Sequence, residues 1–254
     1  MDADDLFSDD GFLDGALRIL QPKKGYRAGS DTVFLAAAVP AAKGEAVFEA
    51  GTGHGVAALC LLSRVEDCHV TGVESDGRAA MLAEKNAHRN GLDTRLRVLR
   101  GDVREAVHQG LAQWPPHGSF AHAFANPPYH RQGSAVASPL AAKARAHAFG
   151  EDDLRAWVKV LAAMVRPRGT VSMIYPAASL DGLLAVMTQF LGGLCILPLQ
   201  PRAGEPAGRV IIQGVKASAA PVTLLPPLIV HEADGGHTQQ ARDILRNGAP
   251  LPLR

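Results

Sequence analysis

The sequence predicts an α/β protein built around an open, mostly parallel sheet, and two observations lead to this class. From residue 45 onward, short apolar strand-like segments alternate with longer segments of helical periodicity, which is typical of β-α-β units. Several strand-like segments also end in a polar residue, and one of them, residues 120–125, stops at Asn126-Pro127-Pro128-Tyr129. Ligands bind at the carboxyl ends of the strands in open α/β sheets, so the same pattern predicts where the site lies.

Composition and charge are those of an ordinary globular protein. The chain has 254 residues, 47% of them hydrophobic and 20% charged, which is enough to bury a large core. Residues 1–14 hold six of the 25 acidic side chains and none of the 26 Lys and Arg, so the remainder is mildly basic. We predict a mobile acidic tail over residues 1–20 and a single domain over residues 21–254. The basic remainder is compatible with a polyanionic partner but is too weakly charged to argue for one alone.

Targeting and redox signals favour a cytoplasmic location. The acidic start lacks the basic region of a signal peptide, and no apolar run approaches the roughly 20 residues that span a bilayer. Cys60, Cys68 and Cys195 have no metal-ligand spacing and are expected to be reduced thiols in the packed interior. We expect no membrane partner, and a monomer is the favoured state.

A strand over residues 46–50 is predicted to lead through Gly51-Thr52-Gly53-His54-Gly55 into a buried helix over residues 56–64. Glycines at this point let the backbone approach a ligand at the helix N-terminus. The spacing is G-x-G-x-G and not the G-x-G-x-x-G of dinucleotide sites, which argues against an NAD-dependent oxidoreductase. Glu49 would attract a cationic centre and repel a pyrophosphate. The alternative is a glycine turn that binds nothing.

A helix over residues 32–42 is predicted before this unit, after a basic, turn-rich segment over residues 21–31. Ser30 or Asp31 is placed to cap that helix, which is the favoured interpretation of Asp31. A contact between Asp31 and a ligand is the alternative.

The next two predicted strands also end in acids. Residues 69–74 end in Glu74 and residues 96–102 end in Asp102, with an amphipathic helix over residues 76–90 between them. Glu74 is placed to accept both ribose hydroxyls of an adenosine, and Asp102 to contact its adenine amino group. Either acid alone is also explained as a helix cap. Three successive strands that end in an acid, followed by a fourth that ends in Asn126, are harder to explain as helix caps alone.

Asn126-Pro127-Pro128-Tyr129 has atoms suited to an exocyclic amine. The side-chain carbonyl of Asn126 and the main-chain carbonyl of Pro127, kept extended by the following proline, are two convergent acceptors. Tyr129 offers a flat face on which a base can stack. The alternative is a plain Asn-Pro turn.

The second half of the chain continues the alternating pattern. We predict helices over residues 152–166 and 180–191 and strands over residues 170–175, 194–199 and 209–215, with the last strand antiparallel. Trp157 has the helical spacing of a core residue. Residues 130–150 form a basic segment beside the predicted site, either a solvated loop or a lid that contacts phosphates.

The ending 231–247 reads as a surface loop with a short helix from Thr238. It holds His231, Glu232, Asp234 and His237, but their spacing matches no standard metal site.

Taken together, Glu49 to Gly55, Glu74, Asp102 and Asn126 to Tyr129 resemble the motifs of class I S-adenosylmethionine-dependent amino-methyltransferases. The chain is most similar to bacterial enzymes that methylate the adenine 6-amino group in the anticodon loop of a valine tRNA. The similarity extends over Gly25 to Leu35, over residues 154–169 and over residues 231–238. It implies a Rossmann-like, seven-stranded, mostly parallel sheet with an antiparallel last strand and helices on both faces.

The resemblance also implies roles for individual residues, with S-adenosylmethionine as the cofactor, tRNA as the partner and no metal. The implied catalytic residues are Asn126, Pro127, Pro128 and Tyr129. The implied cofactor-binding residues are Arg27, Asp31, Glu49, Gly51, Thr52, Gly53, Gly55, Glu74, Ser75, Asp102, Val103 and Asn126. The implied substrate-binding residues are Tyr129, Arg131, Lys143 and Arg145.

Other functions were also weighed from the sequence. Enzymes that methylate guanine in rRNA or a glutamine amide in a protein share the Asn-Pro-Pro-Tyr motif, although the latter carry a helical N-terminal domain that about 45 residues here cannot supply. DNA adenine methyltransferases need a separate target-recognition domain. A non-catalytic cofactor-binding RNA module would not need Asn126.

Overall fold

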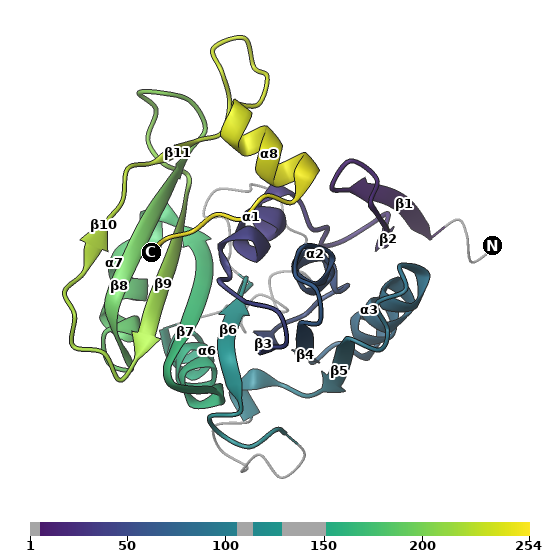
Figure 1. Ribbon diagram of the computed structural model, residues 1–254, viewed down its shortest axis with the longest axis horizontal. Helices are drawn as coiled ribbons and strands as arrows, with labels where there is room; N and C mark the ends of the chain where they lie inside the picture. Colours follow the sequence, from purple (N-terminus) through teal and green to yellow (C-terminus); the bar gives the residue numbers. More distant parts are fainter. Residues whose placement is uncertain (1–5, 106–113, 129–150) are drawn as a thin grey trace, which may run out of the picture.

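A twisted sheet with helices on both faces forms the framework of the protein (Figure 1). The computed structural model describes residues 6–105, 114–128 and 151–254. The strands are β1 (Phe7–Phe12), β2 (Leu17–Pro22), β3 (Ala46–Ala50), β4 (His69–Glu74), β5 (Leu96–Arg100), β6 (Phe120–Ala125), β7 (Val165–Pro176), β8 (Leu191–Gln200), β9 (Arg209–Lys216), β10 (Thr223–Leu224) and β11 (Leu228–Ile229). The helices are α1 (Ser30–Ala38), α2 (Val56–Arg64), α3 (Gly77–Arg89), α6 (Glu151–Met164), α7 (Leu180–Met187) and α8 (Gln239–Asn247), with a 3₁₀ turn at Ala177–Ser179.

The strand order confirms the predicted fold class. Seven strands run in the order β5-β4-β3-β6-β7-β9-β8, and all neighbours are parallel except β9, which is antiparallel to both β7 and β8. Within the described residues, the short strands β10 and β11 extend this sheet beside β8. The chain moves outward from β3 to β5 and then returns to place β6 on the other side of β3. The carboxyl ends of β3 and β6 therefore flank a topological switch point, where open α/β sheets bind ligands.

Successive side chains of the central strands point to opposite faces of the sheet, so the core is divided into two layers. Val47 packs with α1, α2 and α8 on one face, whereas its neighbour Phe48 packs with α6 and α7 on the other. Both side chains are fully buried. Because the central strands are covered on both faces, their sequences are almost continuously apolar, as parallel sheets require. Trp157 belongs to the second layer, which confirms its prediction as a core residue.

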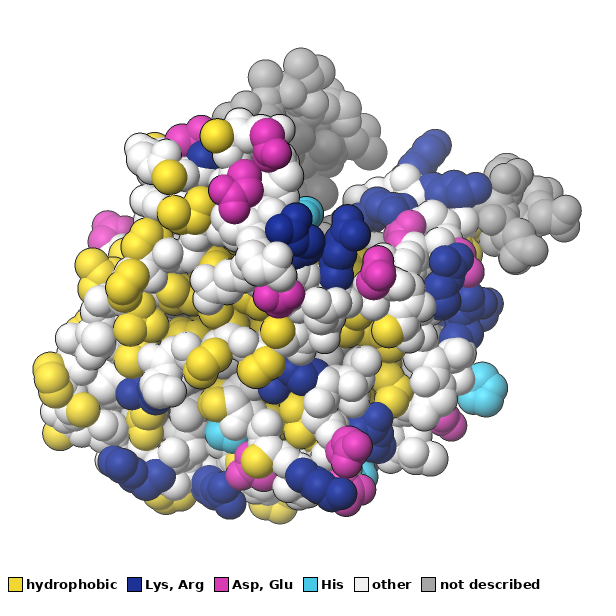
Figure 2. Space-filling model, turned by 45° about the horizontal axis from the view of Figure 1, so that its top comes forward, with side chains coloured by type: hydrophobic (Ala, Val, Ile, Leu, Met, Phe, Trp, Pro, Cys, Tyr) yellow, Lys and Arg dark blue, Asp and Glu magenta, His cyan; other side chains and the backbone are white. Residues whose placement is uncertain are grey.

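Hydrophobic side chains remain exposed at the β8–β10 edge. Val222 and Leu224 are exposed there, and Figure 2 shows hydrophobic side chains gathered on the left of the molecule, the side on which Figure 1 places β10 and β8. Lys and Arg side chains are instead frequent on the opposite side, which carries β1 and β2.

The predicted mobile tail over residues 1–20 is corrected for residues 7–20, because Phe7–Phe12 and Leu17–Pro22 pair as an antiparallel hairpin. Leu17, Ile19 and Gln21 alternate inward along β2 and are at most 2% exposed. The hairpin is fixed to α3 by Asn86, whose side chain donates to Leu20 O (3.1 Å) and accepts from Leu20 N (2.8 Å). Alternating Leu17 and Ile19 were the strand signal, but the neighbouring acids were interpreted as a solvated tail.

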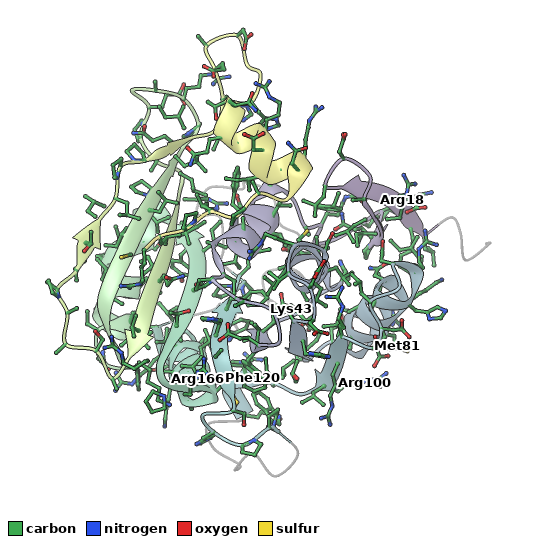
Figure 3. All side chains as sticks on the ribbon, in the orientation of Figure 1. Arg18, Lys43, Met81, Arg100, Phe120 and Arg166 are labelled. Atoms are coloured by element: carbon green, nitrogen blue, oxygen red, sulfur yellow. The ribbon has the colours of Figure 1, made fainter. Side chains whose placement is uncertain are left out.

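The amino ends of the strands are joined by a polar cluster. Glu45 Oε2 contacts His122 Nε2 at 3.0 Å, and Glu45 Oε1 accepts from Arg166 at 2.9 Å. His122 Nδ1 lies 2.7 Å from Thr170 Oγ1. Figure 3 shows Arg166 beside Phe120 at this lower end of the sheet.

The three cysteines lie in the packed interior. Cys60, Cys68 and Cys195 are free and buried, as predicted. Among the described residues, no helix has the length and apolar character needed to cross a bilayer.

Candidate active site

A cavity of about 790 Å³ opens at the carboxyl ends of β3, β4 and β6. Its walls come from the segment before α1, the glycine turn before α2, the ends of these strands, one side chain of α6 and the first residue of β9. Its lining includes Tyr26, Arg27, Ser30, Asp31, Glu49, Gly51, Thr52, Gly53, His54, Glu74, Ser75, Asp102, Val103, Asn126, Pro127, Pro128, Trp157 and Arg209. Segments as far apart in the sequence as Tyr26 and Arg209 therefore meet at the switch point.

The glycine turn needs its glycines for two different reasons. Gly51, Gly53 and Gly55 have φ of 70°, 56° and 85°, the left-handed region that other residues rarely adopt. A Cβ on Gly51 would lie 2.5 Å from Trp157 Cη2, so a side chain here would collide with the wall formed by α6. Gly55 is the N-cap of α2 and lies behind the cavity, so the structure separates it from the other two predicted glycines.

Glu49 is a buried carboxyl with an unused oxygen. The residue is 4% exposed, and Oε2 has no hydrogen-bond partner among the described residues. Burial raises its pKa well above the ordinary 4.5, and the nearby Glu74 carboxylate raises it further. A cationic group brought into the cavity would offset both effects, so Glu49 is suited to bind one.

The rim at the end of β6 also presents an unused acceptor. Asn126, Pro127 and Pro128 line the cavity, and Asn126 Oδ1 is buried without a hydrogen-bond partner in the described part of the chain. A buried unpaired acceptor costs free energy unless a donor reaches it, so Asn126 Oδ1 is suited to accept from a donor group in the cavity. The predicted Asn-Pro turn therefore faces the cavity.

Glu74 and Asp102 both lie at the cavity wall, and each already makes local hydrogen bonds. Glu74 Oε2 accepts from Gly53 N and Oε1 from Asp76 N, both at 2.8 Å, so Glu74 fixes the glycine turn. Asp76, and not Glu74, caps α3. Asp102 accepts from Arg104 N at 2.8 Å and pairs with its guanidinium at 2.6 Å, which lowers the Asp102 pKa. The cap alternative thus holds for Asp102 but not for Glu74.

The expected capping role of Ser30 and Asp31 is wrong. Gly29 is the N-cap of α1, so neither Ser30 nor Asp31, which are the first two residues of the helix, holds the capping position. Asp31 Oδ2 instead accepts from Arg209 Nε at 2.8 Å across the cavity wall. Arg209 lies 178 residues further along the chain, so nothing in the local sequence indicates this ion pair.

The cavity wall also holds residues that were not predicted as site residues, among them Tyr26, His54, Trp157 and Arg209. Tyr26 is 61% exposed at the mouth, and its ring centre lies 6.3 Å from that of His54. Burial lowers the pKa of His54, although Glu74 and Asp76 oppose the shift. The position of His54 inside the glycine turn was the available signal. Trp157 was interpreted only as a core residue because its helical spacing does not show that its ring edge closes the cavity.

Part of the predicted site lies outside the described residues. Tyr129, Arg131, Lys143 and Arg145, together with the predicted lid over residues 130–150, belong to this part. In the C-terminal loop, His231 and His237 form a β-bridge and stack with ring centres 4.9 Å apart.

The residues that line the cavity fit S-adenosylmethionine. Glu49 and Asn126 leave buried acceptors for the amino-acid end and the target group, and the glycine turn leaves main-chain room for the ligand. Fold and site together define a Rossmann-like methyltransferase that uses S-adenosylmethionine.

Comparison with known proteins identifies the family. The methyltransferase small domain family matches residues 27–154, half of the chain, and the protein belongs to it. The chain is 28% identical over 204 residues to the tRNA1(Val) (adenine(37)-N6)-methyltransferase of Aeromonas salmonicida, covering 80% of this chain and 82% of that one. For the enzyme of the same name from Aeromonas hydrophila subsp. hydrophila the identity is 26% over 235 residues, with 91% and 93% covered.

A solved structure supports the same assignment. The crystal structure of a predicted O-methyltransferase, protein Atu636 from Agrobacterium tumefaciens, superposes with a TM-score of 0.71 and 27% identity, covering 87% of this chain and 98% of that one. The expected fold and cofactor are thereby confirmed.

Proposed function

We propose that the protein methylates the 6-amino group of an adenine in the anticodon loop of a tRNA. The observation that carries the proposal is the unpaired, buried Asn126 Oδ1 beside Pro127 at the cavity rim. Relatives that cover most of this chain carry the name of a tRNA adenine N6-methyltransferase, which supports tRNA as the substrate class.

Asn126 and the Pro127 carbonyl supply hydrogen-bond acceptors and no base. An exocyclic amine has two protons to donate, and two convergent acceptors would hold it with the nitrogen lone pair directed into the cavity. S-adenosylmethionine supplies the electrophilic methyl group when bound. The side chains at the rim then act by orienting the amine and excluding water, so proximity accounts for most of the rate.

The remaining lining residues would hold the cofactor by its two ends. Glu49 with Gly51 and Gly53 takes the amino-acid end, Glu74 the ribose and Asp102 the adenine ring. Arg27, Asp31, Thr52, Ser75 and Val103 complete this wall. Gly55 contributes as the start of α2, whose N-terminus faces the turn.

The substrate side of the proposal rests on residues near the rim. Tyr129 would stack on the target base, and the cations Arg131, Lys143 and Arg145 would contact phosphates. Bases in a loop are already partly unstacked, so a compact enzyme reaches one without a duplex-opening domain. We further propose a cytoplasmic monomer with residues 21–254 as one domain, to which the β1–β2 hairpin is joined.

The deciding experiment is nucleoside mass spectrometry of tRNA from a deletion strain, compared with the parent and with a strain complemented by the Asn126→Ala variant. We expect N6-methyladenosine to disappear from one tRNA, to return with the wild-type gene and to stay absent with the variant. Purified enzyme with radiolabelled cofactor should label unmodified tRNA from the deletion strain and not tRNA from the parent. Label in rRNA guanine, a protein glutamine or a hydroxyl group, with none in tRNA, would refute the substrate assignment and leave the fold and the cofactor standing.

A further inference from the structure

The acid-rich start of the chain, which the proposed reaction does not use, contacts the wall of the cavity. Asp10 Oδ2, on β1, lies 2.6 Å from Arg27 Nη2 and accepts the hydrogen bond. Arg27 Nη1 donates to Ser8 Oγ at 2.7 Å and to Pro22 O at 3.2 Å. The hairpin therefore holds the Arg27 guanidinium by three hydrogen bonds.

The same hairpin also holds the main chain beside Arg27. Gln21 is 1% exposed, donates through Nε2 to Asp10 Oδ2 at 2.8 Å and accepts through Oε1 from Ala28 N at 2.8 Å. Asn86 of α3, which binds β2, donates to His54 O at 2.9 Å as well. The hairpin is thus connected to both walls of the cavity, the segment before α1 and the glycine turn.

Arg27 is one of two arginines that line the described part of this cavity, and the other, Arg209, pairs with Asp31. The amino-acid end of the cofactor carries both an ammonium and a carboxylate. Glu49 is suited to the ammonium, so the carboxylate needs a cation on the same side. The three bonds to the hairpin use three of the five N–H groups of a guanidinium, which leaves two for a ligand.

We propose that Asp10 is a positioning residue, which holds Arg27 so that its guanidinium binds the carboxylate at the amino-acid end of S-adenosylmethionine. This inference rests on the proposed function, because it assumes the orientation in which Glu49 holds the ammonium. An arginine that is already fixed before the cofactor binds loses less side-chain freedom on binding. The ion pair between Asp10 and Arg27 therefore strengthens the contact of Arg27 with the cofactor.

Two ligands separate this role from a structural one. S-adenosylhomocysteine carries the amino-acid end, whereas 5′-methylthioadenosine has the same adenosine and sulfur without it. Titration calorimetry of Asp10→Ala should show binding of the first weakened about tenfold, the usual scale of one charge-assisted hydrogen bond, and binding of the second unchanged. Asp10→Asn, which keeps an acceptor for Arg27, should retain most of the affinity.

Asp14→Asn is the matched control, because it removes one negative charge from the same hairpin at the exposed turn. It should bind both ligands as the wild type does. In an Arg27→Ala background, Asp10→Ala should have no further effect, because the two residues act as one unit.

Two results would mean that Asp10 only stabilises the hairpin and would overturn the proposal. One is an equal loss of affinity for the two ligands in Asp10→Ala. The other is a loss of affinity from Asp10→Ala that persists in the Arg27→Ala background. Unchanged S-adenosylhomocysteine binding with a raised KM for tRNA would overturn it too, because Arg27 would then serve the substrate. A different result would show that the tRNA assignment is wrong: the wild-type protein would bind S-adenosylhomocysteine but transfer no radiolabelled methyl group to tRNA.

Discussion

Glu49 Oε2 and Asn126 Oδ1 are among the buried oxygens at the cavity that have no hydrogen-bond partner in the described chain. Each lowers the stability of the ligand-free fold, because a buried acceptor has lost water and gained nothing. Natural sequences retain such residues where function needs them. At these two residues stability and function therefore make opposite demands, and each residue can be tested by its own substitution.

Removing the Asn126 amide should stop methyl transfer without weakening cofactor binding. Asn126→Ala deletes the acceptor that orients the target amine, and loss of one directed hydrogen bond at a reacting group lowers rates by about 10²–10³. Single-turnover assays measure the rate, and calorimetry with S-adenosylhomocysteine measures the affinity. A rate near that of the wild type would show that the rim is only structural.

Neutralising Glu49 should stabilise the ligand-free protein and weaken cofactor binding. Burial raises the Glu49 pKa above 4.5, so the stability from its neutral form is complete below about pH 4.5 and is lost as pH rises through the folded pKa. Glu49→Gln avoids that loss and should raise the free energy of unfolding at pH 7 by about 0.5–2 kcal/mol. The gain should shrink towards pH 4.5 in urea unfolding. A variant that is less stable at pH 7 but binds S-adenosylhomocysteine normally would contradict both assignments.

At the scale of elements, the hairpin β1–β2 is attached to the body of the protein by helix side chains. Asn86 on α3 and Asn90, the C-cap of that helix, each donate to and accept from the main chain of β2. Their side chains bond main-chain groups at the edge of β2 that a neighbouring strand would otherwise bond. Figure 3 shows Arg18 on the outer side of this hairpin, and Asp9 pairs with both Arg18 (3.1 Å) and Arg89 (2.9 Å).

The attachment should depend on Asn86 more than on Asn90. Asn86 is fully buried, so Asn86→Ala leaves Leu20 N, Leu20 O and His54 O without their partner and should cost about 2–3 kcal/mol of stability. Asn90→Ala, one turn away at a more exposed position, is the matched control and should cost about 1 kcal/mol or less. Urea unfolding gives both values, and equal costs would show that burial of the amide does not matter.

The elements that the sequence predicted correctly are those whose signals are local. Residues 46–50, 56–64 and 69–74 are apolar runs bounded by glycines or an acid, and the predicted limits coincide with β3, α2 and β4. The hairpin was missed because its acids have their partners elsewhere: Arg27 lies 17 residues from Asp10, and Arg89 lies 80 residues from Asp9. The site shows the same division. Glu49, Glu74 and Asp102 were placed at the cavity by their position at strand ends, whereas Arg209 pairs with Asp31 from 178 residues away and had no local signal.

At the scale of the whole molecule, the two ends of the sheet have different tasks. The carboxyl end holds the cavity, with unpaired acceptors and glycines in the left-handed region. The amino end holds the Glu45, His122 and Arg166 cluster, in which the polar atoms are paired. Substitutions in that cluster should therefore change stability and leave cofactor binding intact.

Acidification should destabilise the protein through this cluster. Burial lowers the pKa of His122 below 6.5, although Glu45 opposes the shift. Burial alone would raise the pKa of Glu45, but the Ala42 amide, His122 and Arg166 outweigh it and leave that pKa below 4.5. Both folded pKa values are depressed, so the stabilisation is present above the unfolded values and is lost as pH falls, below about 6.5 for His122 and below about 4.5 for Glu45.

The double variant Glu45→Gln, His122→Asn tests this dependence. It should be less stable than the wild type at pH 7 by about 1–3 kcal/mol, because the native hydrogen bonds are lost. Its free energy of unfolding should also vary less between pH 7 and pH 4, because the two groups that take up protons on unfolding are absent. Urea unfolding at intervals across this range measures both effects, with S-adenosylhomocysteine affinity at pH 7 as the check that the cavity is intact. A double variant that loses stability with falling pH as steeply as the wild type would place the acid sensitivity elsewhere, with the carboxylates of the hairpin as the next groups to test.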